Sequence, residues 1–271
     1  MSVPPPREHP DRPGPDRPGP DRPDAGHLDP GHVDRGHLDA GHIDTAHVDP
    51  VAAARFRRLC RSSPWRWRTL RFRVALRAGE EPVEALVRRP LALRIVAAGG
   101  DLVFASTSAR AGTGSYATPA RRSSWLMSPH LVTPVRAPDG LVHRRPEAAY
   151  GEPWYDDPRL ASALDPAQLA GSAPAAAELP HTELITVHAL RETAHEGRPA
   201  LEAVVSPGHA YRVAEPAAAL LGPGRSTVRV DVATGVCVQV EPEEESGPRL
   251  WLRILATDEY VGDDEFVGGV L

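Results

Sequence analysis

Five histidines recur at a fixed spacing near the start of the sequence, and each stands three residues after an aspartate. They are His27, His32, His37, His42 and His47. Spaced imidazoles and carboxylates suit zinc or nickel. An ion would have to fold the segment around itself, so its affinity would be modest. The composition favours a featureless tail, and we predict no metal site; weak metal capture and a partner-binding repeat are the alternatives.

Other residues that could do chemistry lack the partners that a reaction needs. His195-Glu196 has no second histidine at metalloprotease spacing, and we expect it in a solvent-exposed turn. Residues 222–227 read GPGRST, without a phosphate-loop lysine and before a strand. Cys237 alternates with inward valines, so we expect it at a strand surface rather than as a nucleophile. With no G-x-S-x-G elbow either, we predict no enzyme, no catalytic residue and no cofactor.

One stretch combines arginines with aromatic residues. Residues 55–77 hold nine arginines and no acidic residue, with Phe56, Trp65, Trp67 and Phe72 interleaved. Such a surface could dock nucleic acid, acidic lipid or an acidic partner, through Arg66, Arg68 and Arg71. The chain contains no lysine and no asparagine, which is typical of a high-GC genome, so arginine is its only strong cation. We therefore favour the simpler interpretation of an amphipathic helix and strand with arginine on their polar faces.

Composition limits the class of protein. The chain has 271 residues, a net charge of −5, 41% hydrophobic residues, 30 prolines and 23 glycines. The negative charge makes nucleic acid an unlikely partner. The two cysteines, Cys60 and Cys237, make no disulfide framework, which fits a reducing compartment. No segment reaches the roughly 20 apolar residues of a membrane span, and residues 1–50 lack the apolar run of a signal peptide. We expect a cytoplasmic protein.

The elements divide into a tail and a body. From Asp11 the chain repeats every five residues, and this period matches neither a helix nor a strand. We predict that residues 1–50 are a disordered low-complexity repeat tail, and that residues 51–271 form one β-rich domain.

The sequence of the body predicts short helices and two runs of strands. Proline and aspartate signals favour helices over residues 50–60, 157–164 and 165–169. Alternating or short apolar runs predict antiparallel strands. These strands cover residues 69–77, 83–88, 91–97, 102–107, 184–190, 200–205, 210–213, 226–232, 236–241 and 250–257. The clearest pair is the hairpin 226–241, where Gly235 suits the left-handed position of a three-residue turn with a bulge.

Several segments in a fixed order resemble a known family. The first segment is Trp65-Arg-Trp67-x-Thr69, which is followed by residues 83–94 with the sequence VEALVRRPLALR. The next is Gly197-Arg-Pro199. The last are residues 230–236, with the sequence VDVATGV, then Asp258-Glu259 and residues 264–266. This order resembles the actinobacterial members of the LolA-like superfamily, which includes the periplasmic lipoprotein carrier and the RseB/MucB sigma-factor regulators. The resemblance covers most of residues 64–267. The repeat tail and the missing export signal depart from the family.

The resemblance implies a fold and a role. It implies an α+β, mainly antiparallel β fold, in which an unclosed β-barrel or half-barrel sheet with a few covering helices encloses an apolar cavity. Such a cavity receives a lipid acyl chain or an apolar protein segment without catalysis. From apolar faces near an expected loop lid, we predict Phe72, Trp125 and Leu126 as ligand-binding residues. The alternative function is a regulatory interaction protein that docks an acidic partner or nucleic acid through the Arg/aromatic face. The oligomeric state stays open.

Overall fold

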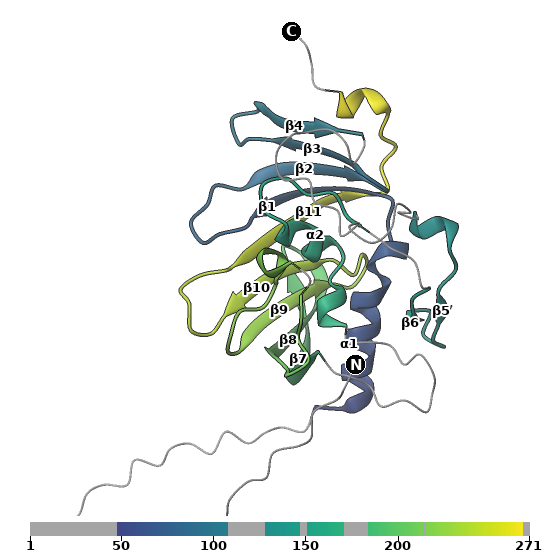
Figure 1. Cartoon of the computed structure of the whole chain (residues 1–271), viewed down its shortest axis with the longest axis vertical. Helices are drawn as coiled ribbons and strands as arrows, with labels where there is room; N and C mark the ends of the chain where they lie inside the picture. The colour runs from purple at the N-terminus through teal and green to yellow at the C-terminus, as the bar shows by residue number, and fades with distance from the viewer. Residues whose placement is uncertain (1–47, 108–127, 147–150, 171–183, 214, 268–271) are drawn as a thin grey trace, which may run out of the picture. The chain divides into compact units, whose positions relative to one another are not determined.

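The structure, a computed structural model, describes residues 48–107, 128–146, 151–170, 184–213 and 215–267 (Figure 1). These residues belong to the unit Asp44–Leu271. The predicted repeat tail lies outside the described residues apart from positions 48–50, and the domain boundary after residue 50 stays a prediction.

Helix α1, Pro50–Ser62, begins where the sequence predicts and runs two residues further. Asp49 caps it, because its carboxylate accepts hydrogen bonds from the backbone N–H groups of Val51 (3.0 Å) and Ala52 (3.3 Å). Ala53, Phe56 and Cys60 recur at spacings of three and four, so they form one buried stripe. This stripe packs the helix against the sheet.

The described residues form an antiparallel nine-stranded sheet that is not closed, in the order β4-β3-β2-β1-β11-β10-β9-β8-β7. The strands are β1 (Thr69–Ala75), β2 (Val83–Arg88), β3 (Ala92–Val96), β4 (Leu102–Ser106), β7 (Ile185–His195), β8 (Arg198–Pro207), β9 (Ser226–Asp231), β10 (Cys237–Pro242) and β11 (Leu250–Thr257). The sheet consists of two meanders joined by pairing of β1 with β11. The predicted fold class, mainly antiparallel β with an unclosed sheet and covering helices, is confirmed.

Smaller elements lie around the sheet. They are α2 (Arg159–Leu164), the 3-10 helices η1 (Ser63–Trp65), η2 (Pro129–Leu131), η3 (Ala167–Leu169), η4 (Pro216–Ala218) and η5 (Asp263–Phe266), and the hairpin β5 (Val135–Arg136) with β6 (Val142–Arg144). The helix expected over 165–169 is thus the single 3-10 turn η3. The strand expected over 210–213 is wrong, because these residues lie in a loop.

The two faces of the sheet differ in chemistry. We call the face that packs on α1 and α2 the inner face, and the opposite face the outer face. In β1, Leu70, Phe72 and Val74 are buried on the inner face, whereas Arg71 and Arg73 lie on the outer face. The alternation of apolar and charged residues thus places the core on one side, as expected for a half-buried strand.

The β9–β10 hairpin confirms the predicted turn but corrects one residue. Gly235 has φ +73°, in the left-handed region, and a Cβ there would come within 2.8 Å of the Leu59 carbonyl oxygen. The register shifts between Cys237 and Gln239. Because of this irregularity, Cys237 is fully buried in the core rather than at a strand surface.

Candidate functional site

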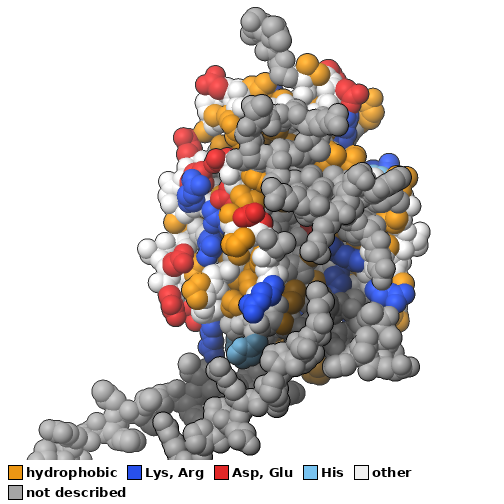
Figure 2. Space-filling view, viewed as in Figure 1, with side chains coloured by type: hydrophobic (Ala, Val, Ile, Leu, Met, Phe, Trp, Pro, Cys, Tyr) orange, Lys and Arg blue, Asp and Glu red, His pale blue; other side chains and the backbone are white. Residues whose placement is uncertain are grey.

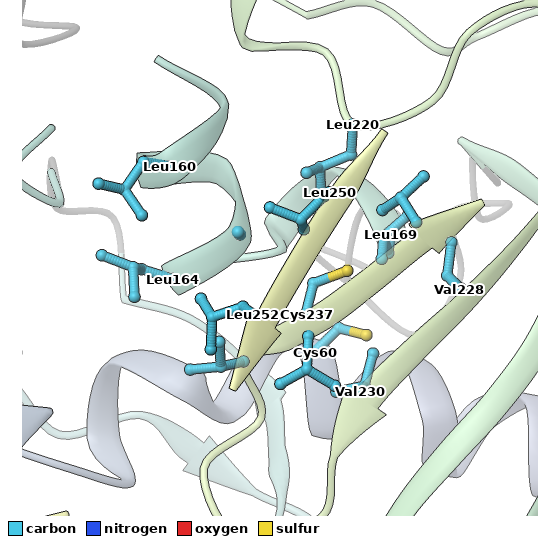
Figure 3. Close-up of a cluster of buried hydrophobic side chains, with 14 of the residues drawn as sticks. Cys60, Leu160, Leu164, Leu169, Leu220, Val228, Val230, Cys237, Leu250 and Leu252 are labelled. Atoms are coloured by element: carbon cyan, nitrogen blue, oxygen red, sulfur yellow. The ribbon is translucent and has the colours of Figure 1, made fainter. Parts of the chain in front are cut away.

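The inner face carries a continuous apolar cluster that reaches from the first meander to the last strands. Phe72, the predicted ligand-binding residue on β1, is fully buried within it. Figure 3 shows how leucines of the small helices face valines of β9, Cys237 of β10 and leucines of β11. Trp125 and Leu126, the other two predicted ligand-binding residues, lie outside the described residues.

Much of this face is covered by short segments, which we call the helical cover: α2, η3 and residues 216–221. Its fully buried leucines are Leu160, Leu164, Leu169 and Leu220. Gln168 ties the parts together. Its side-chain amide donates to the Ala218 carbonyl oxygen (3.0 Å), and its oxygen accepts from the Leu220 N–H (2.8 Å) and from the Tyr211 hydroxyl. Burial raises the pKa of Tyr211, which keeps this hydroxyl a donor.

A buried ion pair holds the chain that leads into the helical cover. Arg89 follows β2, and its Nε donates to the Glu152 carboxylate at 2.8 Å; both side chains are at most 4% exposed. The same guanidinium donates to the carbonyl oxygens of Ser63 (2.9 Å) and Trp67 (2.8 Å), and it stacks 3.2 Å from the centre of the Trp67 ring. Burial raises the pKa of Glu152 and lowers that of Arg89, and their attraction opposes both shifts. The contacts make this pair a structural clamp.

The three arginines of the predicted Arg/aromatic face are used in different ways. Arg66 donates to the carbonyl oxygens of Ala233 (2.7 Å) and Val232 (3.0 Å), and Arg71 pairs with Glu84 and Glu259. Arg68 is exposed, and its guanidinium has no hydrogen bond or ion pair among the described residues. The aromatic residues of the stretch lie largely in the core: Phe56, Trp67 and Phe72 are buried.

His195 and the GPGRST segment, which the sequence analysis tested as possible sites of chemistry, have structural roles. His195, expected in a solvent-exposed turn, is buried at the end of β7. Its Nε2 lies 2.9 Å from the Leu252 carbonyl oxygen, which can only accept, so Nε2 carries the hydrogen. Residues 222–225 lead into β9, and Ser226 and Thr227 are its first two residues. Within the described ranges, no group of three or more His, Cys, Asp and Glu side chains could hold a metal ion.

The two cysteines lie in the same core cluster, Cys60 on α1 and Cys237 on β10 (Figure 3). Burial raises the pKa of both thiols, that of Cys237 to about 12, so neither is a thiolate near neutral pH. A nucleophilic role for either residue therefore has no support in its surroundings.

Two hollows open on the surface of the described part. One, of about 570 Å³, lies between the β1–β2 turn, the start of α2 and the β10–β11 loop, and Arg77, Asp157, Arg159 and Arg249 line it. The other, of about 400 Å³, lies on the outer face around Trp251. In the space-filling view, acidic and basic side chains lie intermixed along one margin (Figure 2). That margin carries no single-sign patch of the kind that binds polyanions through overall charge.

Sequence reasoning missed Trp251, although a signal for it exists. In β11, Leu250, Leu252 and Ile254 are buried, so the alternation places Trp251 and Arg253 on the outer face. A tryptophan on the charged face of a half-buried strand is a cue for a binding surface.

The described fold is thus that of an open antiparallel β-sheet with a short helical cover. No protein-family model matches the sequence, and no curated protein matches it. Among solved structures, the chain is distantly similar to one described as "Crystal structure of MucB", at a TM-score of 0.33 and 13% identity. The match covers 82% of this chain and 64% of that chain, so the chain spans less than two thirds of it. A likeness this distant says nothing about ligand or partner.

None of the described helices is long and apolar enough to cross a membrane.

Proposed function

We propose that the chain is a non-enzymatic binding protein, and that the inner face beneath the helical cover receives an apolar ligand, either a lipid acyl chain or an apolar partner segment. The observation that carries the proposal is the contrast between a broad apolar face and the short segments over it. Helix α2 has six residues and η3 has three, and helices this short are not stable by themselves. The helical cover can therefore open locally without unfolding the sheet.

The energies set the expected affinity. Moving Leu160, Leu164 and Leu169 from the core into water costs about 1.5–3 kcal/mol each, or roughly 5–9 kcal/mol together. An acyl chain of about 15 methylenes gains about 0.8 kcal/mol per buried methylene, or about 12 kcal/mol. The difference of about 3–7 kcal/mol corresponds to dissociation constants from the millimolar range down to about 10 μM. This difference grows where the displaced leucines pack against the ligand.

A titration of the full chain with a fluorescent fatty-acid analogue tests this proposal. Saturable binding with a dissociation constant of about 10 μM or weaker is expected. Leu164→Ala, which shortens a fully buried side chain of α2, should strengthen binding several-fold, because less apolar surface leaves the core when the helical cover opens. Leu255→Ala, at an exposed position of β11, is the matched control and should leave binding unchanged. The absence of saturable binding to the folded chain would count against an apolar ligand.

Docking of an acidic partner or nucleic acid through Arg66, Arg68 and Arg71 is the second candidate. Arg68 favours it, since that guanidinium is exposed and has no ion-pair partner among the described residues. Association should weaken steeply with ionic strength and with Arg68→Glu. Binding that ignores both salt and this substitution would exclude the candidate.

A further inference from the structure

The outer face carries a groove whose chemistry the apolar proposal does not use. It has a volume of about 400 Å³ and lies over β3, β2, β1 and β11. Its basic side chains are Arg73, Arg94 and Arg253, and the half-buried Trp251 lies among them. These four residues, which we call the Trp251 groove, come from three strands that the fold brings together from both meanders.

Two arginines of the groove face each other across the junction of the meanders. Arg73 of β1 lies directly opposite Arg253 of β11. Like charges in this position destabilise an antiparallel pair. The nearest carboxylates give little relief, because Glu84 lies 3.9 Å from Arg73 and Glu196 lies 3.7 Å from Arg253. An anion between the two guanidiniums would remove this repulsion.

The rest of the outer face shows what satisfied arginines look like in this sheet. On the second meander, Arg229 donates to Glu202 at 2.8 Å and to Gln239 at 2.9 Å. In the Trp251 groove, each guanidinium has one carboxylate at 3.7–3.9 Å and no hydrogen bond among the described residues. The N–H donors of these three arginines are therefore available to a ligand. Guanidinium groups in this state bind carboxylates through two parallel hydrogen bonds.

Trp251 adds an apolar platform to these charges. Its strand neighbours on the outer face are Gln239 on β10 and the small Ala75 on β1. The His195 ring lies 6.4 Å away at a tilt of 60°. Among the described residues, the indole N–H has no hydrogen-bond partner. A half-exposed indole beside guanidiniums favours an apolar or aromatic side chain flanked by acids.

We propose that the Trp251 groove binds an acidic segment of a partner protein, in which carboxylates alternate with an apolar or aromatic residue. Glu81 and Glu84 also line the groove, so a densely charged polyphosphate would meet repulsion there, whereas spaced carboxylates can avoid it. Neighbouring strands lie about 4.8 Å apart, and the register offsets Arg94 from Arg73 by two residues along the strand, so the two backbone positions are roughly 12 Å apart across β2. Carboxylates two or four residues apart in an extended chain, about 7 or 14 Å, can span this distance with the reach of their side chains.

The proposal is independent of the apolar ligand, because the groove lies on the opposite face of the sheet. Each of the two can fail without the other. A chain with both sites would hold an apolar ligand on the inner face and a partner segment on the outer face.

Fluorescence anisotropy of a labelled peptide that alternates glutamate with phenylalanine and leucine tests the proposal on the full chain. We expect saturable binding at low salt that weakens with ionic strength, and little binding of the matched peptide with glutamine in place of glutamate. Arg73→Gln and Arg253→Gln should each weaken binding about five-fold or more, as expected for a lost charge-assisted pair. Trp251→Leu should weaken it as well. Circular dichroism confirms that each variant is folded.

Arg212→Gln is the matched control, since Arg212 is exposed, unpaired among the described residues and outside the groove. It should leave peptide binding unchanged. Absence of saturable binding, equal loss with Arg212→Gln, or tighter binding of a single-stranded oligonucleotide than of the peptide would each overturn the proposal. The last result would assign the groove to polyanions instead.

Discussion

The clamp between Arg89 and Glu152 gives the sharpest prediction about stability. Glu152→Gln keeps the shape of the side chain and removes its charge, which leaves the guanidinium of Arg89 buried without a counter-ion. Both side chains are at most 4% exposed, so water cannot screen the loss. Removing one partner of a buried pair costs about 3–5 kcal/mol. We expect the free energy of unfolding to fall by this amount.

A double-mutant cycle separates the ion pair from the other contacts of Arg89. Arg89→Met loses Glu152 and also leaves the buried carbonyl oxygen of Trp67 without its donor, at about 1–3 kcal/mol, whereas the Ser63 carbonyl oxygen still accepts from the Arg66 N–H. In Arg89→Met/Glu152→Gln, which combines the two single changes, the uncompensated charge is absent. The double variant should therefore be less destabilised than the sum of the single variants, by about 2 kcal/mol or more.

Urea unfolding followed by tryptophan fluorescence measures these energies, because Trp67 stacks on Arg89. The control is the exposed pair Arg55–Glu192, whose side chains are 48% and 81% exposed. Glu192→Gln should cost less than about 0.5 kcal/mol. If Glu152→Gln costs no more than this control, or if the two single changes at the clamp are additive, the reasoning is wrong.

Three further predictions concern single buried groups. Burial lowers the pKa of His195, so below about pH 6.5 the unfolded chain binds a proton that the folded chain does not. The free energy of unfolding should therefore decrease as the pH is lowered through this range. His195→Gln should flatten this pH dependence in urea titrations. Native protein should leave Cys60 and Cys237 unreacted with a thiol reagent, and unfolded protein should react at both; a fast native reaction would contradict their burial. Gly235→Ala should cost about 2 kcal/mol or more, because it adds a contact with the Leu59 carbonyl oxygen to the left-handed strain. The comparison is Gly79→Ala, with φ +75° and open space, which should cost only about 1 kcal/mol by thermal or urea unfolding.

Local patterns were enough to predict most strands. The bounds predicted for β2 and β11 agree with the structure, and β1 ends two residues earlier than predicted, because alternation of apolar and charged residues is a local property. Pairing of β1 with β11 was not predictable in the same way. It joins residues more than 170 positions apart, and no local pattern encodes that choice.

The errors also have local causes. Cys237 was expected at a surface because strict alternation was assumed, and the register shift after it turns the side chain inward. His195 was expected in solvent because charged and turn residues follow it, yet a type I′-like pair, Glu196 and Gly197, both with positive φ, carries the turn and leaves His195 in β7.

The candidate sites were harder to predict than the strands. The mixed use of Arg66, Arg68 and Arg71 depends on which carbonyls and carboxylates the fold brings near each guanidinium. The Trp251 groove combines residues from both meanders, so it exists only through the pairing of β1 with β11. Sequence alone suggests that Trp251 lies on the outer face, but it does not supply its neighbours.

Backbone hydrogen exchange of the full chain, with and without a saturated fatty acid, tests the central claim most directly. The claim is that the inner face beneath the helical cover receives an apolar ligand. The account predicts that the ligand changes exchange in residues 159–169 and 216–221 while strands β7 and β8 of the second meander keep their protection. Unchanged exchange in the helical cover at saturating fatty acid, or a change limited to the strands of the sheet, would contradict it.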